Sequence, residues 1–561
     1  AGRSASGSTS WDYDVHGNVI SKIQVQDTVT LATAYEWDAG HLSGMTYPSG
    51  RQVEFIRVRG KVTSIEVDGL PLITDVHYHS AGGIQSWDRG PSAGVFTRAF
   101  DTAGRLTSWM HPSGERTLAW GDDNLLTSVS VPQGVIASYE YDDNGRLTRE
   151  LTATSDQGYS YDVNGNRMGT SVNGTPYPYA VSWASNRLIS AATPSGTHSY
   201  QYNANGEITS DGIRVVLRWN PFGQVRESVS QGVTTQYAYN GLGNRVQKLV
   251  VADASKTRHY VYAEDDLSLI GEYGPAGETL TETVWLEGIP VLVMTPTAIY
   301  HVVPGHLNEP RALLSNNGTV VWQWDSDAFG VGQASGVLAY NLRFPGQQYD
   351  VETGLHYNNA RYYDPITGRY RSSDPLGLLG GFGTYTYANG NPLSFVDPEG
   401  ELPLPVVTGL VGAAANTAAT LFWQIADPDQ RIHAGKLGVA AGVGFVQGFL
   451  APTTAGSSWL GSRAIGTLAN VAQTIGSSWV ECGNYNSDGL AMGQAFITGA
   501  IGGGMTRFVK PRFDPSKAAL FQMPLTAQAI KEATSTRVLM FSLGAGYMAN
   551  APTVLKQGSN Q

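Results

Sequence analysis

Two copies of the motif Asp-Pro-x-Gly contain the carboxyl groups whose spacing best suits chemistry. They run from Asp374 to Gly377 and from Asp397 to Gly400. A single motif of this kind is typical of a turn, in which Asp bonds to the backbone, Pro fixes φ and Gly takes the left-handed conformation. Two carboxyl groups that meet in a partly dry site cannot both ionise easily, so one becomes an acid and the other a base. Such a pair can activate water and protonate a peptide group, which is aspartyl protease chemistry.

For the two motifs to meet, the chain between them must return on itself. Turn signals at 380–381 (Gly-Gly) and 389–392 (Asn-Gly-Asn-Pro) predict this return. A third motif at 364–368 is longer by one residue. We expect Asp364 and Arg361 to support the pair, with Arg361 holding a carboxylate by a bidentate contact. Two purely structural turns are the alternative.

The elements that must position these groups belong to a repeat of about twenty residues. Its unit is an aromatic, one residue, a second aromatic, Asp or Asn, two residues, Gly or Asn, a polar residue and an aliphatic. Six good copies lie at 11–20, 35–42, 139–147, 159–167, 200–208 and 237–246, and degenerate copies lie at 100–106, 183–188 and 219–225. We take the second aromatics to be Tyr141, Tyr161, Trp183, Tyr202, Trp219 and Tyr239.

Each copy predicts a β-hairpin. The aromatic pair alternates as in a strand, and Asp-x-x-Gly supplies side-chain hydrogen bonds and a residue that tolerates positive φ. One hairpin cannot bury its face alone, but stacked copies form a continuous sheet that twists and can close around a cavity. A solenoid or propeller that encloses nothing is the alternative.

The repeats resemble the YD repeats of Rhs proteins, of the C component of Tc toxins and of teneurins. The stretch 300–330 resembles their linker, and 344–400 resembles the Rhs-associated core almost throughout. The resemblance implies a mainly β fold, a hollow cocoon of β-hairpins plugged by the core. It also implies a paired Asp-Pro-x-Gly autoprotease with Asp374 and Asp397 as catalytic residues. The implied cut falls at the bond between Glu401 and Leu402, although relatives often have Leu where this chain has Glu401.

Composition predicts two parts that join near Glu401. The resemblance implies a further division, into a YD-repeat shell (1–299), the core with its autoprotease (300–401) and a C-terminal cargo (402–561). Residues 402–561 contain ten Lys and Arg against six Asp and Glu, a net charge of +4, whereas the whole chain carries −11 and the remainder therefore −15. An acidic shell lacks the basic stripe or clustered Arg and Lys that binding to nucleic acid would need. The single Cys482 excludes an intrachain disulfide, and no Cys/His cluster has zinc spacing. We expect no cofactor and no metal.

The cargo contains apolar runs that could span a membrane. Uncharged stretches at 402–424 and 437–462 reach the roughly 20 residues that a membrane helix needs. Gly438, Gly442, Gly444 and Gly448 are spaced for close helix packing in lipid. We therefore predict a mainly α, Ala/Gly-rich, pore-forming toxin. A packing or translocation segment is the alternative, and an enzymatic toxin is a weaker one, because His433 and Cys482 are the only His and Cys of the cargo.

The resemblance also implies a route and partners. A secreted effector would hold its own C-terminal segment in the shell, leave by a system such as type VI secretion with a spike protein and a chaperone, and act at the target inner membrane. An immunity protein would protect the producing cell. A teneurin-like adhesion protein is the alternative from another functional class.

Overall fold

The computed structural model describes residues 2–3, 7–80, 83–264 and 267–405. The described residues belong to one compact unit of the chain. From residue 406 on, the helical, membrane-spanning cargo predicted from the sequence lies outside the described residues. Within the described part, no helix is long and apolar enough to cross a membrane. That part is built from antiparallel strands and three short 3-10 helices, so the mainly β expectation is confirmed for it.

The first sheet has twenty strands, each paired antiparallel with the next along the chain. The strands are β1 (Gly2–Arg3), β2 (Gly7–Tyr13), β3 (Val19–Gln26), β4 (Val29–Asp38), β5 (His41–Thr46), β6 (Gln52–Val58), β7 (Lys61–Val67), β8 (Leu70–Tyr78), β9 (Ile84–Asp88), β10 (Val95–Phe100), β11 (Leu106–Trp109), β12 (Arg116–Trp120), β13 (Leu126–Val131), β14 (Gly134–Tyr141), β15 (Leu147–Thr152), β16 (Asp156–Tyr161), β17 (Arg167–Val172), β18 (Thr175–Val181), β19 (Leu188–Thr193) and β20 (Gly196–Ser199).

The second sheet has fourteen strands with the same sequential pairing. They are β21 (Gln201–Tyr202), β22 (Ile208–Ser210), β23 (Val215–Trp219), β24 (Val225–Ser230), β25 (Val233–Tyr239), β26 (Arg245–Val250), β27 (Arg258–Tyr262), β28 (Leu269–Tyr273), β29 (Thr279–Leu286), β30 (Ile289–Met294), β31 (Ile299–Pro304), β32 (Pro310–Leu314), β33 (Val320–Trp324) and β34 (Ala334–Gly336). The helix η1 (Ala254–Lys256) joins β26 to β27. The predicted boundary at residue 299 coincides with the start of β31, and the sheet continues through it.

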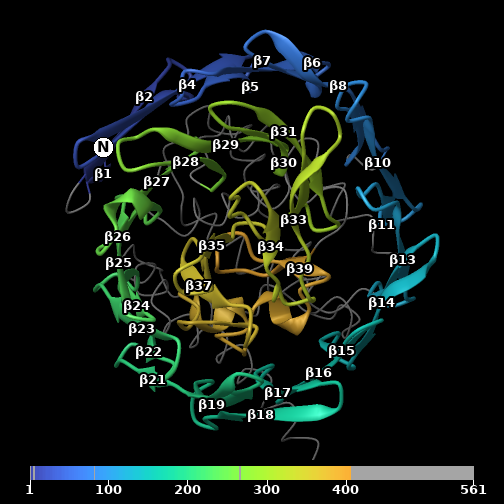
Figure 1. Ribbon diagram of the computed structural model, residues 1–561, viewed down its shortest axis with the longest axis vertical. Coiled ribbons are helices and arrows are strands. Elements are labelled where there is room, and N and C mark those ends of the chain that lie inside the picture. Colours follow the sequence, from blue (N-terminus) through green and yellow to red (C-terminus); the bar gives the residue numbers. More distant parts are fainter. Residues whose placement is uncertain (1, 4–6, 81–82, 265–266, 406–561) are drawn as a thin grey trace, which may run out of the picture. The chain divides into compact units, whose positions relative to one another are not determined.

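The segment after this sheet forms two small sheets that position the candidate site. The first contains β35 (Gln348–Asp350), β36 (Leu355–Asn358), β37 (Arg361–Asp364) and β38 (Arg369–Tyr370), and the second pairs β39 (Phe395–Val396) with β40 (Leu404–Pro405). The helices η2 (Gly377–Gly380) and η3 (Ala388–Gly390) lie between them. In Figure 1 the blue-to-green hairpins β1–β26 form an outer ring, and the yellow and orange strands of this segment lie inside it.

The repeats form hairpins as predicted, and an Asp or Asn side chain holds most of their turns. In the copy at 159–167, the Asp162 carboxylate accepts hydrogen bonds from the backbone amides of Asn164 at 2.9 Å and Asn166 at 2.8 Å. Gly165 has a φ of 86°, a conformation that side chains with a Cβ rarely adopt. The turn chemistry of the sequence therefore fixes where each hairpin reverses.

The second aromatic of a repeat bonds to the preceding repeat. Its hydroxyl or indole NH donates to the carbonyl oxygen of the aliphatic residue that begins the preceding return strand. The pairs are Trp37 with Val19, Trp120 with Leu106, Tyr141 with Leu126, Tyr161 with Leu147, Tyr202 with Leu188, Trp219 with Ile208 and Tyr239 with Val225, at 2.7 to 2.9 Å. These bonds explain why Tyr or Trp recurs at this position, because Phe has no donor.

Trp183 is an exception, and its assignment as a second aromatic was wrong. The strand β18 ends at Val181, which pairs with Leu188, so Trp183 lies in the turn that follows. Its side chain is 96% exposed. Val181 occupies the inward position, and Trp183 instead corresponds to Val163, which is 98% exposed in its own turn. The spacing of aromatic residues alone misplaced the register, because the residue at the inward position of this copy is the aliphatic Val181.

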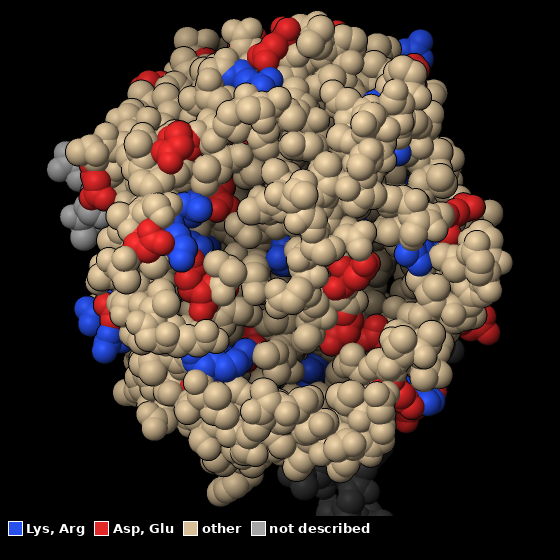
Figure 2. Space-filling view, viewed as in Figure 1, with Lys and Arg blue, Asp and Glu red and all other residues tan. Residues whose placement is uncertain are grey.

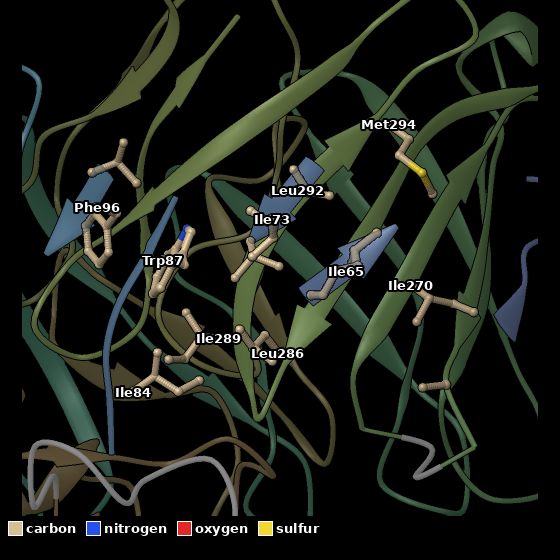
Figure 3. Close-up of a cluster of buried hydrophobic side chains, with 14 of the residues drawn as sticks. Ile65, Ile73, Ile84, Trp87, Phe96, Ile270, Leu286, Ile289, Leu292 and Met294 are labelled. Carbon is tan, nitrogen blue, oxygen red and sulfur yellow. The ribbon is translucent and has the colours of Figure 1, made fainter. Parts of the chain in front are cut away.

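The main hydrophobic core lies between the outer ring and the strands inside it. Figure 3 shows Ile65, Ile73 and Trp87 of the ring facing Leu286 and Leu292 of β29 and β30. All five side chains are at most 1% exposed. Hydrogen bonds also join the ring to the inner strands. For example, the hydroxyl of Tyr47 donates to the carbonyl oxygen of Thr283 at 3.0 Å. The inner strands thus stabilise the ring by burying its apolar face.

The core segment, residues 344–405, is attached to several repeats in turn. Arg245 forms a fully buried ion pair with Asp350 at 2.5 Å. The hydroxyl of Tyr385 donates to the carbonyl oxygen of Gly206 at 2.6 Å. The side-chain amide of Asn391 donates to the carbonyl oxygen of Gly145 at 2.9 Å. These contacts hold the segment rigidly, which a precise site requires.

The surface in Figure 2 is a mixture of charges. Acidic and basic side chains alternate on this face among mostly uncharged residues, and its described residues form no extended basic stripe. Binding to the phosphate backbone of nucleic acid generally needs such a stripe.

Candidate active site

Both Asp-Pro-x-Gly motifs form turns, and the turns aim their carboxyl groups at the same place. The backbone amide of Gly377 donates to the carbonyl oxygen of Asp374 at 2.9 Å, and that of Gly400 donates to Asp397 at 3.3 Å. In the first turn, the Asp374 carboxylate also accepts from the amide of Leu376 at 2.8 Å. The structural interpretation of each motif is therefore correct, and it leaves one oxygen of each carboxylate for other partners.

Arg361 brings these two carboxylates together. Its Nη2 lies 2.9 Å from Oδ2 of Asp374 and 3.0 Å from Oδ2 of Asp397. The predicted bidentate fork is not formed, because one nitrogen serves both carboxylates while Nε donates to the carbonyl oxygen of Gly400. Because two oxygens contact the same nitrogen, the carboxylates are neighbours.

Tyr370 and Asn358 complete the surroundings of Asp397. The Tyr370 hydroxyl donates to Oδ2 of Asp397 at 2.7 Å, and Asn358 Nδ2 lies 2.7 Å from that hydroxyl and 2.8 Å from the Asp397 carbonyl oxygen. The guanidinium of Arg361 stacks 3.6 Å from the centre of the Tyr370 ring. Sequence reasoning missed both residues, although Tyr370 precedes Asp374 by only four positions.

The predicted scissile segment lies against the same guanidinium. The strands β39 and β40 pair with each other, with Val396 opposite Leu404. The chain between them, from Asp397 to Pro403, therefore forms a closed loop. Nη2 of Arg361 donates to the carbonyl oxygen of Glu401 at 3.4 Å, and the amide of Glu401 donates to Oδ1 of Asp397 at 2.8 Å. The carbonyl group of the peptide bond between Glu401 and Leu402 therefore accepts from the same nitrogen that contacts both carboxylates.

Burial sets the electrostatics of the site. Asp397 is fully buried and Asp374 is 7% exposed. Burial, opposed by Arg361 and reinforced by Asp397, raises the pKa of Asp374 to about 6. Burial also raises the pKa of Glu401 to about 8, with further contributions from Glu399, Asp374 and Asp397. The site can thus hold a proton near neutral pH, as acid-base chemistry requires.

Asp364 does not join this group. Its carboxylate lies 2.8 Å from Arg371 Nη2 and 2.7 Å from Arg214 Nη2, and both arginines also contact Asp211. This buried ion cluster ties the core segment to the turn before β23. Asp364, which we expected to support the pair, thus lies apart from Asp374 and Asp397, because β37 carries Arg361 and Asp364 at opposite ends.

Within the described residues, no group of three or more His, Cys, Asp and Glu side chains is arranged to hold a metal ion. The chemistry that this geometry can perform is acid-base chemistry by carboxyl groups on a nearby peptide bond.

Three comparisons place the chain among known proteins. Residues 135–379 match the family model Teneurin YD-shell. The chain is 28% identical over 449 residues to the probable deoxyribonuclease RhsA of Dickeya dadantii, an alignment that covers 72% of this chain and 30% of that protein. It is 28% identical over 370 residues to the toxin protein Tse5 of Pseudomonas aeruginosa, covering 53% of this chain and 27% of that protein. The chain thus spans less than a third of the length of these curated relatives.

The fold is similar to that in a solved structure of the Photorhabdus luminescens Tc holotoxin pore. The TM-score is 0.57 at 17% sequence identity, and the match covers 71% of this chain and 23% of the other. At this identity the likeness is one of fold.

Proposed function

Because this chain is a YD-repeat shell protein of the Rhs type, related to the Tc toxins, we propose that it encapsulates a C-terminal toxin and frees it by cutting itself. The proposed cargo is residues 402–561, and the proposed cut is the bond between Glu401 and Leu402. Asp374 and Asp397 are the proposed catalytic residues of this single-turnover aspartyl protease.

The geometry suits a division of roles between the two carboxyl groups. Asp397 faces three donors, namely Arg361, the Tyr370 hydroxyl and the Glu401 amide, which is the environment of a carboxylate that accepts a proton from water. Asp374, whose pKa is raised to about 6, is the proposed acid that protonates the departing nitrogen of Leu402. Arg361 stabilises the negative charge that develops on the Glu401 carbonyl oxygen.

One observation carries the proposal. A single buried atom, Nη2 of Arg361, contacts Asp374, Asp397 and the carbonyl oxygen of Glu401. Two unrelated turns have no reason to converge on one guanidinium together with the next peptide group. Convergence of an acid, a base and a polarised carbonyl is what peptide hydrolysis requires.

The test compares carboxyl variants of the full chain on a denaturing gel. The wild type should run as two pieces, residues 1–401 and 402–561, and Asp374→Asn and Asp397→Asn should each run as one. Asp142→Asn is the matched control: Asp142 holds a repeat turn, and Asn takes its place in the copy at 200–208. Equal cleavage of the wild type and both site variants would refute the aspartyl pair.

We further propose that the cargo permeabilises the target inner membrane. The support is the sequence of 402–561, whose uncharged runs reach the length of a membrane helix. The released segment should then make sealed liposomes leak. The variants His433→Ala and Cys482→Ser should cause as much leakage as the wild-type segment. The variant Gly442→Leu should cause less leakage than the wild-type segment, because a bulky residue separates packed helices.

A nuclease cargo is the second candidate, favoured by the name of the relative in Dickeya dadantii. It would degrade DNA while liposomes stay sealed, so the two assays on the same preparation separate the candidates. In either case the proposed route is export as a secreted effector, for which a type VI spike protein, a chaperone and an immunity protein are the proposed partners.

A further inference from the structure

The tight turn between β36 and β37, residues 358–361, faces the loop that contains the proposed cut. Asn358 ends β36, Arg361 begins β37, and the two residues pair across this β36–β37 turn. Its donors bind four carbonyl oxygens of the loop: Asn358 Nδ2 binds that of Asp397 at 2.8 Å, the amide of Ala360 that of Glu399 at 3.1 Å, Nε of Arg361 that of Gly400, and Nη2 of Arg361 that of Glu401 at 3.4 Å. The turn thus holds the main chain of the loop on the amino side of the cut.

Gly400 comes so close to this turn that no side chain fits there. A Cβ on Gly400 would collide with the carbonyl oxygen of Asn358 and would lie 3.2 Å from the backbone nitrogen of Arg361. Gly346 makes a second approach of this kind, because a Cβ there would collide with the carbonyl oxygen of Pro398. Close main-chain contacts, which glycine permits, therefore fix the path of the loop.

The side chain of Glu401 takes no part in these contacts. It is partly exposed, and within the described residues no hydrogen bond or ion pair joins its carboxyl group to another residue. The bound groups of Glu401 are its amide, which donates to Asp397, and its carbonyl oxygen, which accepts from Arg361. Every amino acid except proline offers the same two groups.

We propose that the β36–β37 turn binds the substrate loop of the self-cleaving site and selects the cut through the main chain and Gly400, whatever side chain stands at position 401. This inference rests on the proposed self-cleavage and states which peptides the site accepts. They are loops in which a glycine precedes the residue whose carbonyl group is attacked. The turn places that carbonyl oxygen at Nη2 of Arg361, beside both carboxylates.

The shell holds this turn in place. Asn359, the turn residue with a φ of 47°, accepts at Oδ1 a hydrogen bond of 3.3 Å from Nδ2 of Asn244, which belongs to the repeat at 237–246. A turn that is anchored in this way can place a carbonyl group precisely.

The experiment compares full chains with changes in this loop and outside it. Each chain is made by cell-free translation at neutral pH, the cut fraction is followed over time on denaturing gels, and mass spectrometry identifies the first residue of the small fragment. The variants are Glu401→Gln, Glu401→Leu, Glu401→Ser, Gly400→Ala, Asp374→Asn and a chain with one Ser inserted between Gly400 and Glu401. Gly354→Ala is the matched control, because Gly354 has a φ of 70° against 71° for Gly400, while a Cβ there would meet nothing within 4 Å.

The three Glu401 variants should cut within about fivefold of the wild-type rate and at the same bond. The comparison is one between uncharged side chains, because burial and neighbouring carboxyl groups raise the pKa of Glu401 to about 8. Gly400→Ala should cut roughly 100-fold more slowly, because the collision displaces the loop, whereas Gly354→Ala should cut like the wild type. The two Ala variants carry the same backbone strain, so their difference measures the collision alone.

The chain with the inserted Ser tests the selection most sharply. The Ser then follows Gly400 and takes the bound position, so the small fragment should begin at Glu401. An insertion chain that stays whole, or whose fragment still begins at Leu402, would overturn the inference.

Two further results would overturn the inference and leave the aspartyl pair intact. One is a Glu401 variant that cuts more than about fivefold more slowly than the wild type, and the other is equal cutting by Gly400→Ala and Gly354→Ala. Cleavage of Asp374→Asn at the wild-type rate, or a wild type that stays whole, would instead overturn the proposed function itself.

Discussion

The hydroxyl of Tyr141 donates a hydrogen bond of 2.7 Å to the carbonyl oxygen of Leu126, which begins the return strand of the preceding hairpin. This bond and its equivalents in the other repeats link each hairpin to the one before it. They make the second aromatic of the repeat both a core residue and a polar anchor.

Tyr141→Phe should therefore destabilise the shell by about 1 kcal/mol, since it removes one mostly buried hydrogen bond and leaves a carbonyl without its partner. Tyr13→Phe is the matched control, because Tyr13 is the second aromatic of the first repeat and is 57% exposed. Thermal unfolding of the two variants measures the difference. Equal midpoints would show that the inter-repeat bond adds nothing to stability.

Gly380 tests how sharply Asp374 must be placed. A Cβ on Gly380 would clash with the Asp374 carboxylate, so Gly380→Ala should displace this carboxyl group and slow cleavage by roughly 10 to 100-fold. Gly274→Ala is the control, because its Cβ would meet the Glu278 carboxylate in a shell turn far along the chain. The rates are read from gels, and equal rates would mean that the position of Asp374 does not limit cleavage.

Asp364 should behave in the opposite way to Asp374. Asp364→Asn leaves Arg371 and Arg214 without one of their buried partners, which should cost about 3 kcal/mol of stability. The folded variant should nevertheless cut itself, because Asp364 lies outside the group formed by Arg361, Asp374 and Asp397. An uncut but folded Asp364→Asn chain would return this residue to the site.

The carboxyl group of Glu150 should make the stability of the folded chain depend on pH. Burial, reinforced by Asp327, raises its pKa to about 7 in the fold, whereas its ordinary value is 4.5. The folded chain thus keeps a proton that the unfolded chain loses, so stability should fall as the pH rises from 4.5 to 7. Glu150→Gln should remove this loss and gain at most about 3 kcal/mol above pH 7 but nothing at pH 4.5. Glu140→Gln, an exposed change in the same hairpin, should alter the unfolding midpoint little at either pH.

Local sequence signals predicted the hairpins and the meeting of the two Asp-Pro-x-Gly turns. Turn residues such as Asp162 and Gly165 act on their own neighbours, so their effect is visible in a short stretch of sequence. The same holds for the Asp-Pro-x-Gly turns, whose repetition indicated a pair.

Contacts between distant segments could not be predicted in this way. Nothing near Asp364 in the sequence indicates that Arg214, 150 residues earlier, will bind it. The roles of Tyr370 and Asn358 likewise depend on how β36, β37 and β38 pair, which spacing alone does not reveal. Trp183 was misplaced because Val181, and not an aromatic residue, takes the inward position at the end of β18.

The mass of the intact chain tests the central claim most directly. The purified wild type, denatured and measured by mass spectrometry, should give two species whose smaller member begins at Leu402, and Asp397→Asn should give the single mass of 561 residues. A wild type that remains whole, or an Asp397→Asn chain that yields the same two species, would contradict self-cleavage by this aspartyl pair.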